Sequence, residues 1–168
     1  LALLESSGRR VIIPDESNPS RRLCCGRTFL SSGLIDEAKQ EAARLVENLF
    51  PHLERGVPIV GMEPSCVFTI KDELPALFLG EKAQKLADHI QMLDEYLLNE
   101  QCSGLLKLEF NASGTEKVLL HGHCHQKAFD SVDATVRLME NVGIEVETIS
   151  SSCCGMAGSF GYQSENYQ

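Results

Sequence analysis

The chain has 168 residues, of which 43% are hydrophobic and 23% charged, and its formal net charge is −9 at pH 7. This composition is typical of a folded globular protein with one large domain or two small ones. The acidic balance argues against nucleic acid as a partner, because phosphate binding needs a basic surface. No apolar run approaches the roughly 18 residues of a membrane-spanning helix, and the N-terminus has no signal-peptide pattern.

Short strands alternate with amphipathic helices in the first part of the chain. The first residues have the pattern of a helix end, stopped at Gly8 and followed by a β-branched strand that ends at Ile13. Further along, the pattern predicts a helix over 36–49, a strand over 57–61, a helix over 66–78 with a break at Pro75, and a helix over 81–98. The two longest helices have an apolar face, formed by Ala38, Ala42, Leu45, Val46 and Leu49 in one and by Leu86, Ile90, Leu93 and Leu97 in the other.

The same alternation continues to the end of the chain. The pattern predicts a strand over 105–110, a turn over 111–114, a buried-type strand over 118–121 and a helix over 126–141. Val132, Val136 and Met139 form the apolar stripe of that helix, and a short strand follows Gly143. Strands that alternate with helices in this way are typical of an α/β fold with largely parallel sheets.

The tripeptide Cys-Cys-Gly occurs twice, as Cys24-Cys25-Gly26 and as Cys153-Cys154-Gly155. Each copy follows a helix end, a glycine, a short strand and a polar loop, so that residues 3–13 align with residues 138–148. We therefore expect duplicated Rossmann-like halves with short, largely parallel sheets. The first repeat would occupy residues 1–110, with linking helices but without its N-terminal strand, and the second residues 111–168, without its C-terminal part. The chain thus has the pattern of an excerpt from a longer protein.

Neighbouring cysteines suit a metal centre better than a mutual disulfide, because bridging adjacent residues strains the disulfide geometry. The chain has seven cysteines and no export signal, which indicates a reducing compartment, where paired cysteines more often serve metal or redox chemistry. Six of them follow predicted strands, and ligands gather at the carboxyl ends of parallel strands. We expect two sites, the first with Cys24, Cys25 and Cys66 and the second with Cys124, Cys153 and Cys154.

The residues alone leave the kind of centre open. Three thiolates are an incomplete set for an iron–sulfur cluster, which normally takes four, and a zinc site would need one more ligand. His121, His123 and His125 flank Cys124, and His123 is included as a candidate metal ligand. The other interpretations are metal-free buried thiols and a Cys124 nucleophile with His121 or His123 as its base.

Other polar residues near the motifs have a simpler interpretation. Cys102 has no motif around it and is expected to be a structural or exposed thiol. Glu63, three residues before Cys66, is expected to be a solvated carboxylate, with weak metal binding as the alternative. Five arginines gather near the first Cys-Cys-Gly, where they form a solvated surface or help to hold an anionic cluster. These are Arg9, Arg10, Arg21, Arg22 and Arg27.

The cysteine motifs resemble the cysteine-rich CCG domain of iron–sulfur oxidoreductases. This family includes a subunit of heterodisulfide reductase, the iron–sulfur subunits of glycolate oxidase and of anaerobic glycerol-3-phosphate dehydrogenase, and lactate-utilisation iron–sulfur proteins. The most similar group is the C-terminal region of FAD-linked oxidases of the D-lactate dehydrogenase type. The resemblance rests on Leu23-Cys24-Cys25-Gly26-Arg27, Glu63-Pro64-Ser65-Cys66, His121-Gly122-His123-Cys124-His125-Gln126-Lys127 and Ser152-Cys153-Cys154-Gly155-Met156-Ala157-Gly158-Ser159-Phe160-Gly161.

The resemblance implies an electron-transfer module of an FAD-linked oxidoreductase that acts on a 2-hydroxy acid such as D-lactate or glycolate. The six motif cysteines would then bind iron–sulfur clusters of the 4Fe-4S type, with zinc as the alternative. Two departures bear on this. Glu63 stands where the family has the first cysteine of Cys-x-x-Cys, and the closing Cys-x-x-Cys of the second motif would lie beyond Gln168. FAD would bind elsewhere in the longer protein, so this chain alone is not expected to oxidise a substrate.

The implied partners are an FAD-binding domain or subunit and an electron acceptor. We expect a cytoplasmic location, with peripheral association at the inner face of the membrane as an extension of it and with no transmembrane segment. The sheet edge left open by the missing first strand would also allow a homodimer. The alternative function is a non-catalytic, zinc-stabilised structural or subunit-interaction domain, whose cysteines hold the fold while its acidic surface binds a partner.

Overall fold

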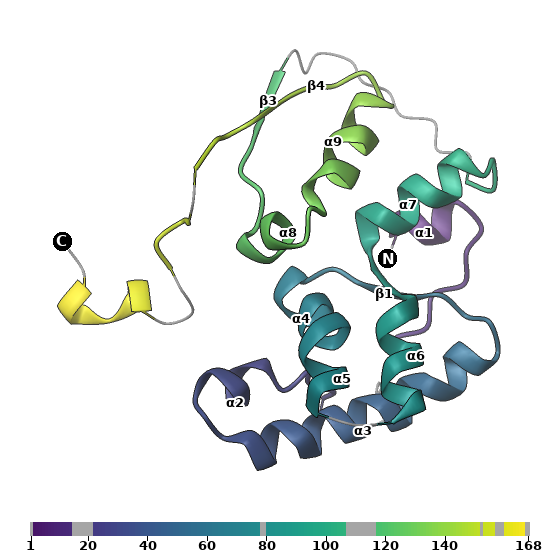
Figure 1. The fold of residues 1–168 in the computed structure, drawn as a ribbon. Coiled ribbons are helices and arrows are strands. Elements are labelled where there is room, and N and C mark those ends of the chain that lie inside the picture. Colours follow the sequence, from purple (N-terminus) through teal and green to yellow (C-terminus); the bar gives the residue numbers. More distant parts are fainter. Residues whose placement is uncertain are drawn as a thin grey trace. The chain divides into compact units, whose positions relative to one another are not determined.

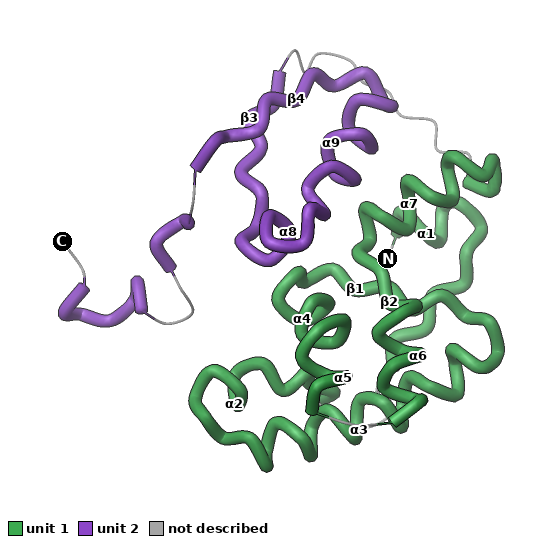
Figure 2. The backbone as a smooth tube through the Cα atoms, in the orientation of Figure 1, with its two compact units in different colours: residues 1–109 green, residues 110–168 purple. Residues whose placement is uncertain are grey.

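A computed structural model shows the chain as two compact units, residues 1–109 and 110–168, coloured green and purple in Figure 2. The structure describes residues 2–14, 22–77, 80–106, 117–151, 153–156 and 160–166. Each unit is considered by itself below. That the two units descend from one duplicated repeat stays a prediction.

Unit 1 combines a small parallel sheet with several helices. The helices are α1 (Ala2–Ser6), α2 (Arg27–Ser31), α3 (Ile35–Glu54), α4 (Pro64–Phe68), α5 (Leu74–Leu77), α6 (Glu81–His89) and α7 (Leu93–Cys102), and a π-helical segment (Thr69–Glu73) joins α4 to α5. Strands β1 (Ile59–Gly61) and β2 (Ile90–Met92) pair in parallel, with Ile59 opposite Ile90. Helix α3 is the longest helix in Figure 1 and lies against α2 and α6.

The core of unit 1 forms between α3, the sheet and α4 to α6. The predicted apolar face of α3 is confirmed, because Ala38, Ala42, Leu45, Val46 and Leu49 are all buried, together with Phe50. Opposite this face, the buried residues come from the strands and from the helices after β1: Ile59, Val67, Phe68, Ile70, Leu74, Ala83, Leu86, Ile90 and Met92. Cys25 belongs to the same cluster, so one motif cysteine is part of the core.

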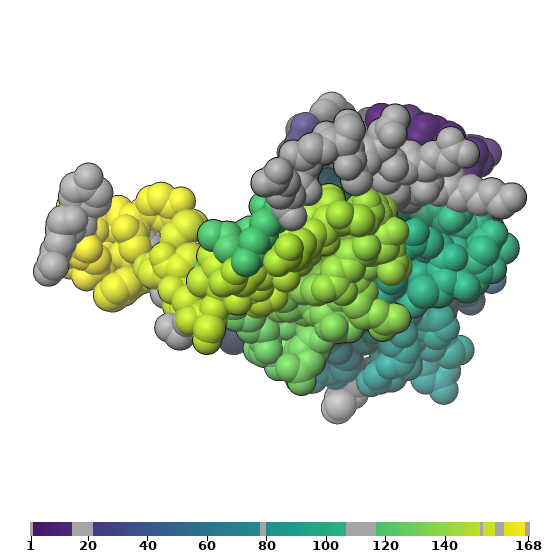
Figure 3. All heavy atoms as spheres, turned by 90° about the horizontal axis from the view of Figure 1, so that it is seen from above, coloured from purple at the N-terminus to yellow at the C-terminus, as the bar shows by residue number. Residues whose placement is uncertain are grey.

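Unit 2 is a smaller βαβ arrangement with little buried surface. Strands β3 (Lys117–Leu120) and β4 (Glu145–Thr148) pair in parallel. Helices α8 (Cys124–Ala128) and α9 (Val132–Glu140) connect them, and two 3₁₀ turns (Phe160–Tyr162 and Ser164–Asn166) follow. Figure 3 shows atoms of this unit lying at the surface, and among its described residues only Gly122 and Ser131 are buried.

Two predicted helices were wrong, because each is interrupted. The helix predicted over 81–98 is α6 and α7 with β2 between them. Ile90 and Met92 keep the helical spacing of apolar residues, yet they are buried by extended pairing with β1, and this nonlocal pairing outweighs the local pattern. The helix predicted over 126–141 is α8 and α9, with a break at Asp130, which has φ 52°. Aspartate is one of the few residues that tolerates this left-handed conformation.

The remaining differences concern chain segments around the sheets. Residues 11–13 form no strand, and Ile12 and Ile13 are 42% and 46% exposed. The helix predicted over 66–78 begins earlier, at Pro64, and its irregularity precedes Pro75 as the π-helical segment. The proline ring would clash with the carbonyl four residues before it, and a wider turn relieves that clash. Leu105 and Leu106 are not in a strand, and residues 107–114, predicted as strand and turn, lie outside the described residues.

The fold therefore agrees with an α/β class built on short parallel sheets, each of two strands. Duplicated Rossmann-like halves are not confirmed, since unit 1 does not form the strand that would precede its Cys-Cys-Gly. Among the helices that the structure describes, none is both long and apolar enough to cross a membrane.

The core of unit 1 gives a test of this packing. Leu86 is fully buried, so Leu86→Ala should destabilise the protein by about 2–5 kcal/mol through lost contacts and a cavity. Leu105→Ala, at a residue that is 65% exposed, is the matched control and should change stability little. Urea denaturation followed by circular dichroism measures both, and equal effects of the two substitutions would contradict this core.

Candidate metal centres

The first centre brings together two cysteines that are distant in sequence. The Sγ atoms of Cys25 and Cys66 lie 3.3 Å apart, although the residues are separated by 41 positions. Cys25 lies in the turn before α2 and is 7% exposed, while Cys66 lies in α4 just after β1 and is partly exposed. The fold thus places a turn thiol against a helix thiol inside unit 1.

Both Cys-Cys-Gly turns have the same local geometry. The backbone N–H of Gly26 donates to Sγ of Cys24 at 3.4 Å, and that of Gly155 donates to Sγ of Cys153 at 3.3 Å. Each glycine has a left-handed backbone, with φ 82° and 87°. Such N–H groups stabilise the thiolate form of a cysteine, and hydrogen bonds to sulfur are one way in which a protein tunes a thiolate-bound centre.

Helix α4 presents Cys66 through a capped start. Glu63 is the N-cap residue, and its Oε1 accepts hydrogen bonds from the Ser65 backbone N–H at 3.2 Å and the Ser65 hydroxyl at 2.7 Å. Pro64 follows at the first helical position, where a missing N–H costs nothing. The Glu-Pro pair was a readable sequence signal for this cap. It assigns to Glu63 a helix-capping role that the sequence interpretation missed.

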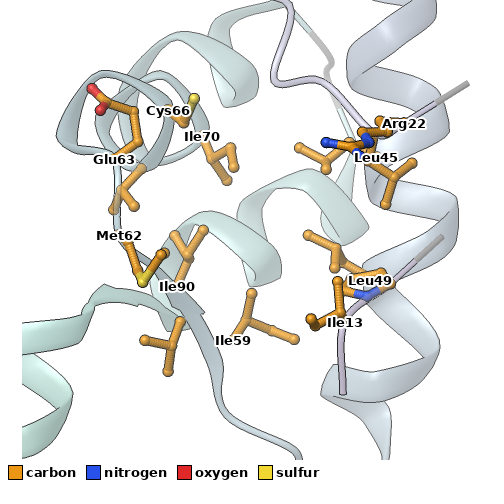
Figure 4. Close-up of a pocket in the computed structure, with 15 residues that line it drawn as sticks. Ile13, Arg22, Leu45, Leu49, Ile59, Met62, Glu63, Cys66, Ile70 and Ile90 are labelled. Carbon is orange, nitrogen blue, oxygen red and sulfur yellow. The ribbon is translucent and has the colours of Figure 1, made fainter. Parts of the chain in front are cut away.

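An apolar cavity of about 690 Å³ borders Cys66 in unit 1. Figure 4 shows Glu63, Cys66 and Ile70 on one side and Arg22, Leu45 and Leu49 on the other, with Ile59 and Ile90 between them. Most of its lining is aliphatic, so a charge on Cys66 is only partly solvated.

The close contact between the two thiols separates their ionisation. Cys25 donates its S–H to Cys66, which raises the pKa of Cys25 far above its usual range, with burial adding to the effect. The same hydrogen bond lowers the pKa of Cys66 to about 7, against the opposing effects of burial and of the Glu63 charge. The pair therefore holds one proton and one negative charge near neutral pH.

The second centre lies at the carboxyl ends of the parallel strands of unit 2. Cys124 follows β3 and Cys153 follows β4, and their Sγ atoms lie 3.9 Å apart although the residues are 29 positions apart. Cys124, Cys153 and Cys154 are all exposed. The two centres thus differ in burial while sharing the turn geometry. Cys102, outside both, is an exposed thiol.

The histidines beside Cys124 have roles in the fold. Nδ1 of His123 accepts the backbone N–H of His125 at 3.2 Å, so His123 caps α8 and its other ring nitrogen carries the proton. Its ring also stacks on that of His125, with centroids 5.2 Å apart. Nζ of Lys127 lies 3.4 Å from Nε2 of His121 and donates to the Ser151 carbonyl at 2.8 Å. As a metal ligand, His123 would have to give up this cap or its ring proton.

The donor set fits a thiolate-bound group. A metal ion with metal–sulfur bonds of about 2.3 Å in tetrahedral geometry separates its sulfur ligands by roughly 3.8 Å, close to both observed pairs. Within the part of the chain that the structure describes, no group of three or more His, Cys, Asp or Glu side chains is arranged to hold a metal ion. Each centre thus brings one pair of thiols together, while Cys24 and Cys154 stand next to the pairs in sequence. The full ligand sets stay a prediction.

The two turn glycines should respond differently to substitution. A Cβ at Gly26 would lie 2.9 Å from the carbonyl oxygen of Ala38, whereas a Cβ at Gly155 would meet nothing within 4 Å. Gly155→Ala should therefore cost only the left-handed backbone, about 1–2 kcal/mol, and Gly26→Ala more than that. Hydrogen exchange of peptides from each unit measures the two losses separately, and a Gly26→Ala loss no larger than that of Gly155→Ala would contradict the close packing on α3.

The hydrogen bond from Cys25 predicts a pH dependence. In the metal-free protein, alkylation of Cys66 should rise through about pH 7, where its thiolate forms. Cys25→Ala removes the donor, so the pKa of Cys66 should return toward the usual value of about 8.5 and alkylation at pH 7 should slow about tenfold. Mass spectrometry with iodoacetamide measures the rate, with Cys102 as the internal control. An unchanged Cys66 rate would show that the contact does not favour the thiolate.

Comparisons with known proteins place these cysteines in a family context. Residues 118–168 match the family described as "CCG: Cysteine-rich domain". The chain is 30% identical over 154 residues to the C subunit of anaerobic glycerol-3-phosphate dehydrogenase of Escherichia coli (strain K12), and the match covers 88% of the chain and 37% of that protein. It is 32% identical over 168 residues to lactate utilization protein A of Bacillus licheniformis, covering 94% of the chain and 64% of that protein.

A similar match joins the chain to lactate utilization protein A of Geobacillus kaustophilus, at 32% identity over 168 residues, again covering 94% of the chain and 64% of the relative. The chain thus spans about a third to two thirds of the length of these relatives. No solved structure matches the chain. These matches confirm the predicted resemblance: the chain carries a cysteine-rich CCG domain at residues 118–168 and is related to a dehydrogenase component and to lactate-utilization proteins.

Proposed function

We propose that this chain is an electron-transfer module that binds iron–sulfur clusters through Cys24, Cys25 and Cys66 and through Cys124, Cys153 and Cys154. The observation that carries the proposal is the approach of thiols from distant segments, to 3.3 Å in unit 1 and 3.9 Å in unit 2. Thiolates are the usual ligands of such clusters, and a bound cluster would supply one-electron transfer. The chain's own part is to hold the thiols, to donate N–H groups to their sulfur atoms and to shield the first site from water.

The longer protein would pass electrons between an FAD-linked dehydrogenase and an acceptor. The relatives named for anaerobic glycerol-3-phosphate dehydrogenase and for lactate utilization support an oxidoreductase that acts on a small hydroxylated substrate. We propose a 2-hydroxy acid such as D-lactate or glycolate, with FAD bound by a partner domain or subunit. Kinship with the FAD-linked oxidases, the cytoplasmic location, peripheral membrane association and a homodimer stay predictions.

A zinc-stabilised structural or subunit-interaction domain is the second candidate. It is favoured by the 3.9 Å separation of the Cys124 and Cys153 sulfur atoms, which matches one tetrahedral metal ion. His123 belongs to this candidate, as the fourth ligand that zinc would take after releasing the cap of α8. Zinc has no redox chemistry, so metal analysis separates the two functions.

Metal analysis of cysteine variants tests the proposal. Protein purified without oxygen should contain iron and acid-labile sulfide and absorb visible light. Cys66→Ser and Cys124→Ser should each remove the iron of one site and leave the other, because each deletes one ligand of one centre. Cys102→Ser is the control and should keep all the iron, since Cys102 belongs to neither centre.

The possible results separate the candidates. Colourless protein with stoichiometric zinc and no iron would overturn the electron-transfer proposal and support the structural one. Loss of iron in Cys102→Ser to the same extent as in Cys66→Ser would show that the assigned ligands are wrong.

A further inference from the structure

An ion pair links the two cysteine-bearing segments of unit 1. Arg27, directly after the first Cys-Cys-Gly, contacts Glu73 through Nη1 and Oε1, across 46 positions in sequence. Glu73 is the last residue of the π-helical segment that follows α4, which carries Cys66. The same two segments also meet where the thiols of Cys25 and Cys66 approach.

The ion pair and the thiol contact are two separate attachment points. Arg27 lies two residues after Cys25, and Glu73 lies seven residues after Cys66. At a helical rise of about 1.5 Å per residue, seven residues place the two contacts roughly 10 Å apart along the helical segment. One contact alone would let the turn pivot against α4, whereas two contacts at this separation fix its orientation.

The π-helical segment places Glu73 for this contact. It lies between Cys66 and Glu73, and one extra residue in a helix rotates everything after it by about 100° relative to what precedes it. The direction of Glu73 relative to Cys66 therefore depends on the wide turn. Such π segments occur often at functional sites.

The stability of the fold does not account for this pair. The side chains of Arg27 and Glu73 are 35% and 33% exposed, and ion pairs of this exposure contribute little to folding. The second Cys-Cys-Gly has Met156 in the place of Arg27, and Met156 is instead an exposed residue whose Sδ accepts from the Tyr162 hydroxyl. The ion pair thus distinguishes the buried centre from the exposed one.

We propose that Arg27 and Glu73 are positioning residues of the first cysteine centre, and that their ion pair sets the separation of the Cys25 and Cys66 thiols. The inference deepens the proposed function, because it concerns a ligand pair of that site, but it concerns the protein's own residues and can be tested without a bound cluster.

Disulfide formation in the metal-free protein measures the separation. Diamide takes two electrons and two protons from two thiols, which form the disulfide while the diazene becomes a hydrazine. In a Cys24→Ser background, which removes the neighbouring thiol, mass spectrometry follows the Cys25–Cys66 disulfide. The Cys124–Cys153 disulfide in the same molecule serves as the internal reference, because its thiols lie in unit 2.

Removing either charge should slow the first disulfide. Arg27→Gln and Glu73→Gln should each lower its rate relative to the reference by about twofold to fivefold, the range that a partly exposed ion pair supplies. Exchange of the charges in Arg27→Glu/Glu73→Arg should restore it. Arg9→Gln is the matched control, because Arg9 pairs with Glu100 in the same unit and its loss should leave the ratio unchanged.

Three results would overturn the inference: an unchanged ratio in Arg27→Gln and Glu73→Gln, an equal loss in Arg9→Gln, or no recovery in the charge exchange. Should one single variant fail to fold, Arg27→Lys, which keeps the charge, and the other single variant decide the matter through the same ratio. Iron analysis of the parent protein is independent of these rates. Absence of iron there would contradict the proposed function and leave the positioning result standing on its own.

Discussion

The parallel direction of β3 and β4 is the constraint that creates the second centre. Leu120 and Thr148, the last residues of the two strands, lie opposite each other in register. Since parallel strands end at the same edge, the loops that follow both leave from one place. Cys124 and Cys153 lie a few residues beyond these ends, and the 3.9 Å between their sulfur atoms follows from that topology. An antiparallel pair would have sent the two loops to opposite edges.

The first centre reaches a similar thiol pair by a different route. Only Cys66 follows a strand there, while Cys25 comes from a turn that packs on α3 through the close approach of Gly26 to Ala38. The tripeptide and its N–H to sulfur contact are the same in both units, but the elements that support them differ. This is why the sequence repeat shows in the turns, whereas duplicated Rossmann-like halves are not confirmed.

Local signals predicted what depends on local structure. The buried face of α3, strand β3 and the Cys-Cys-Gly turns each followed from spacing or composition within a short segment. The failures are nonlocal: residues 90–92 satisfy a helical pattern and become a strand only because β1 offers a partner. Glu73 carried no local mark at all, because its contact with Arg27 lies 46 positions away. The cap at Glu63 is the exception, since its signal was present and was not used.

Burial gives the two centres different electrostatics. In the first, water cannot stabilise two thiolates at once, so the Cys25 thiol keeps its proton while Cys66 carries the charge. A cationic group that takes both sulfur atoms must displace that proton, and its affinity for the buried pair therefore rises as protons become scarce. The exposed thiols of the second centre are each solvated and face no such competition for one charge. The same tripeptide can thus support two centres of unlike affinity and potential, because their surroundings rather than their ligands differ.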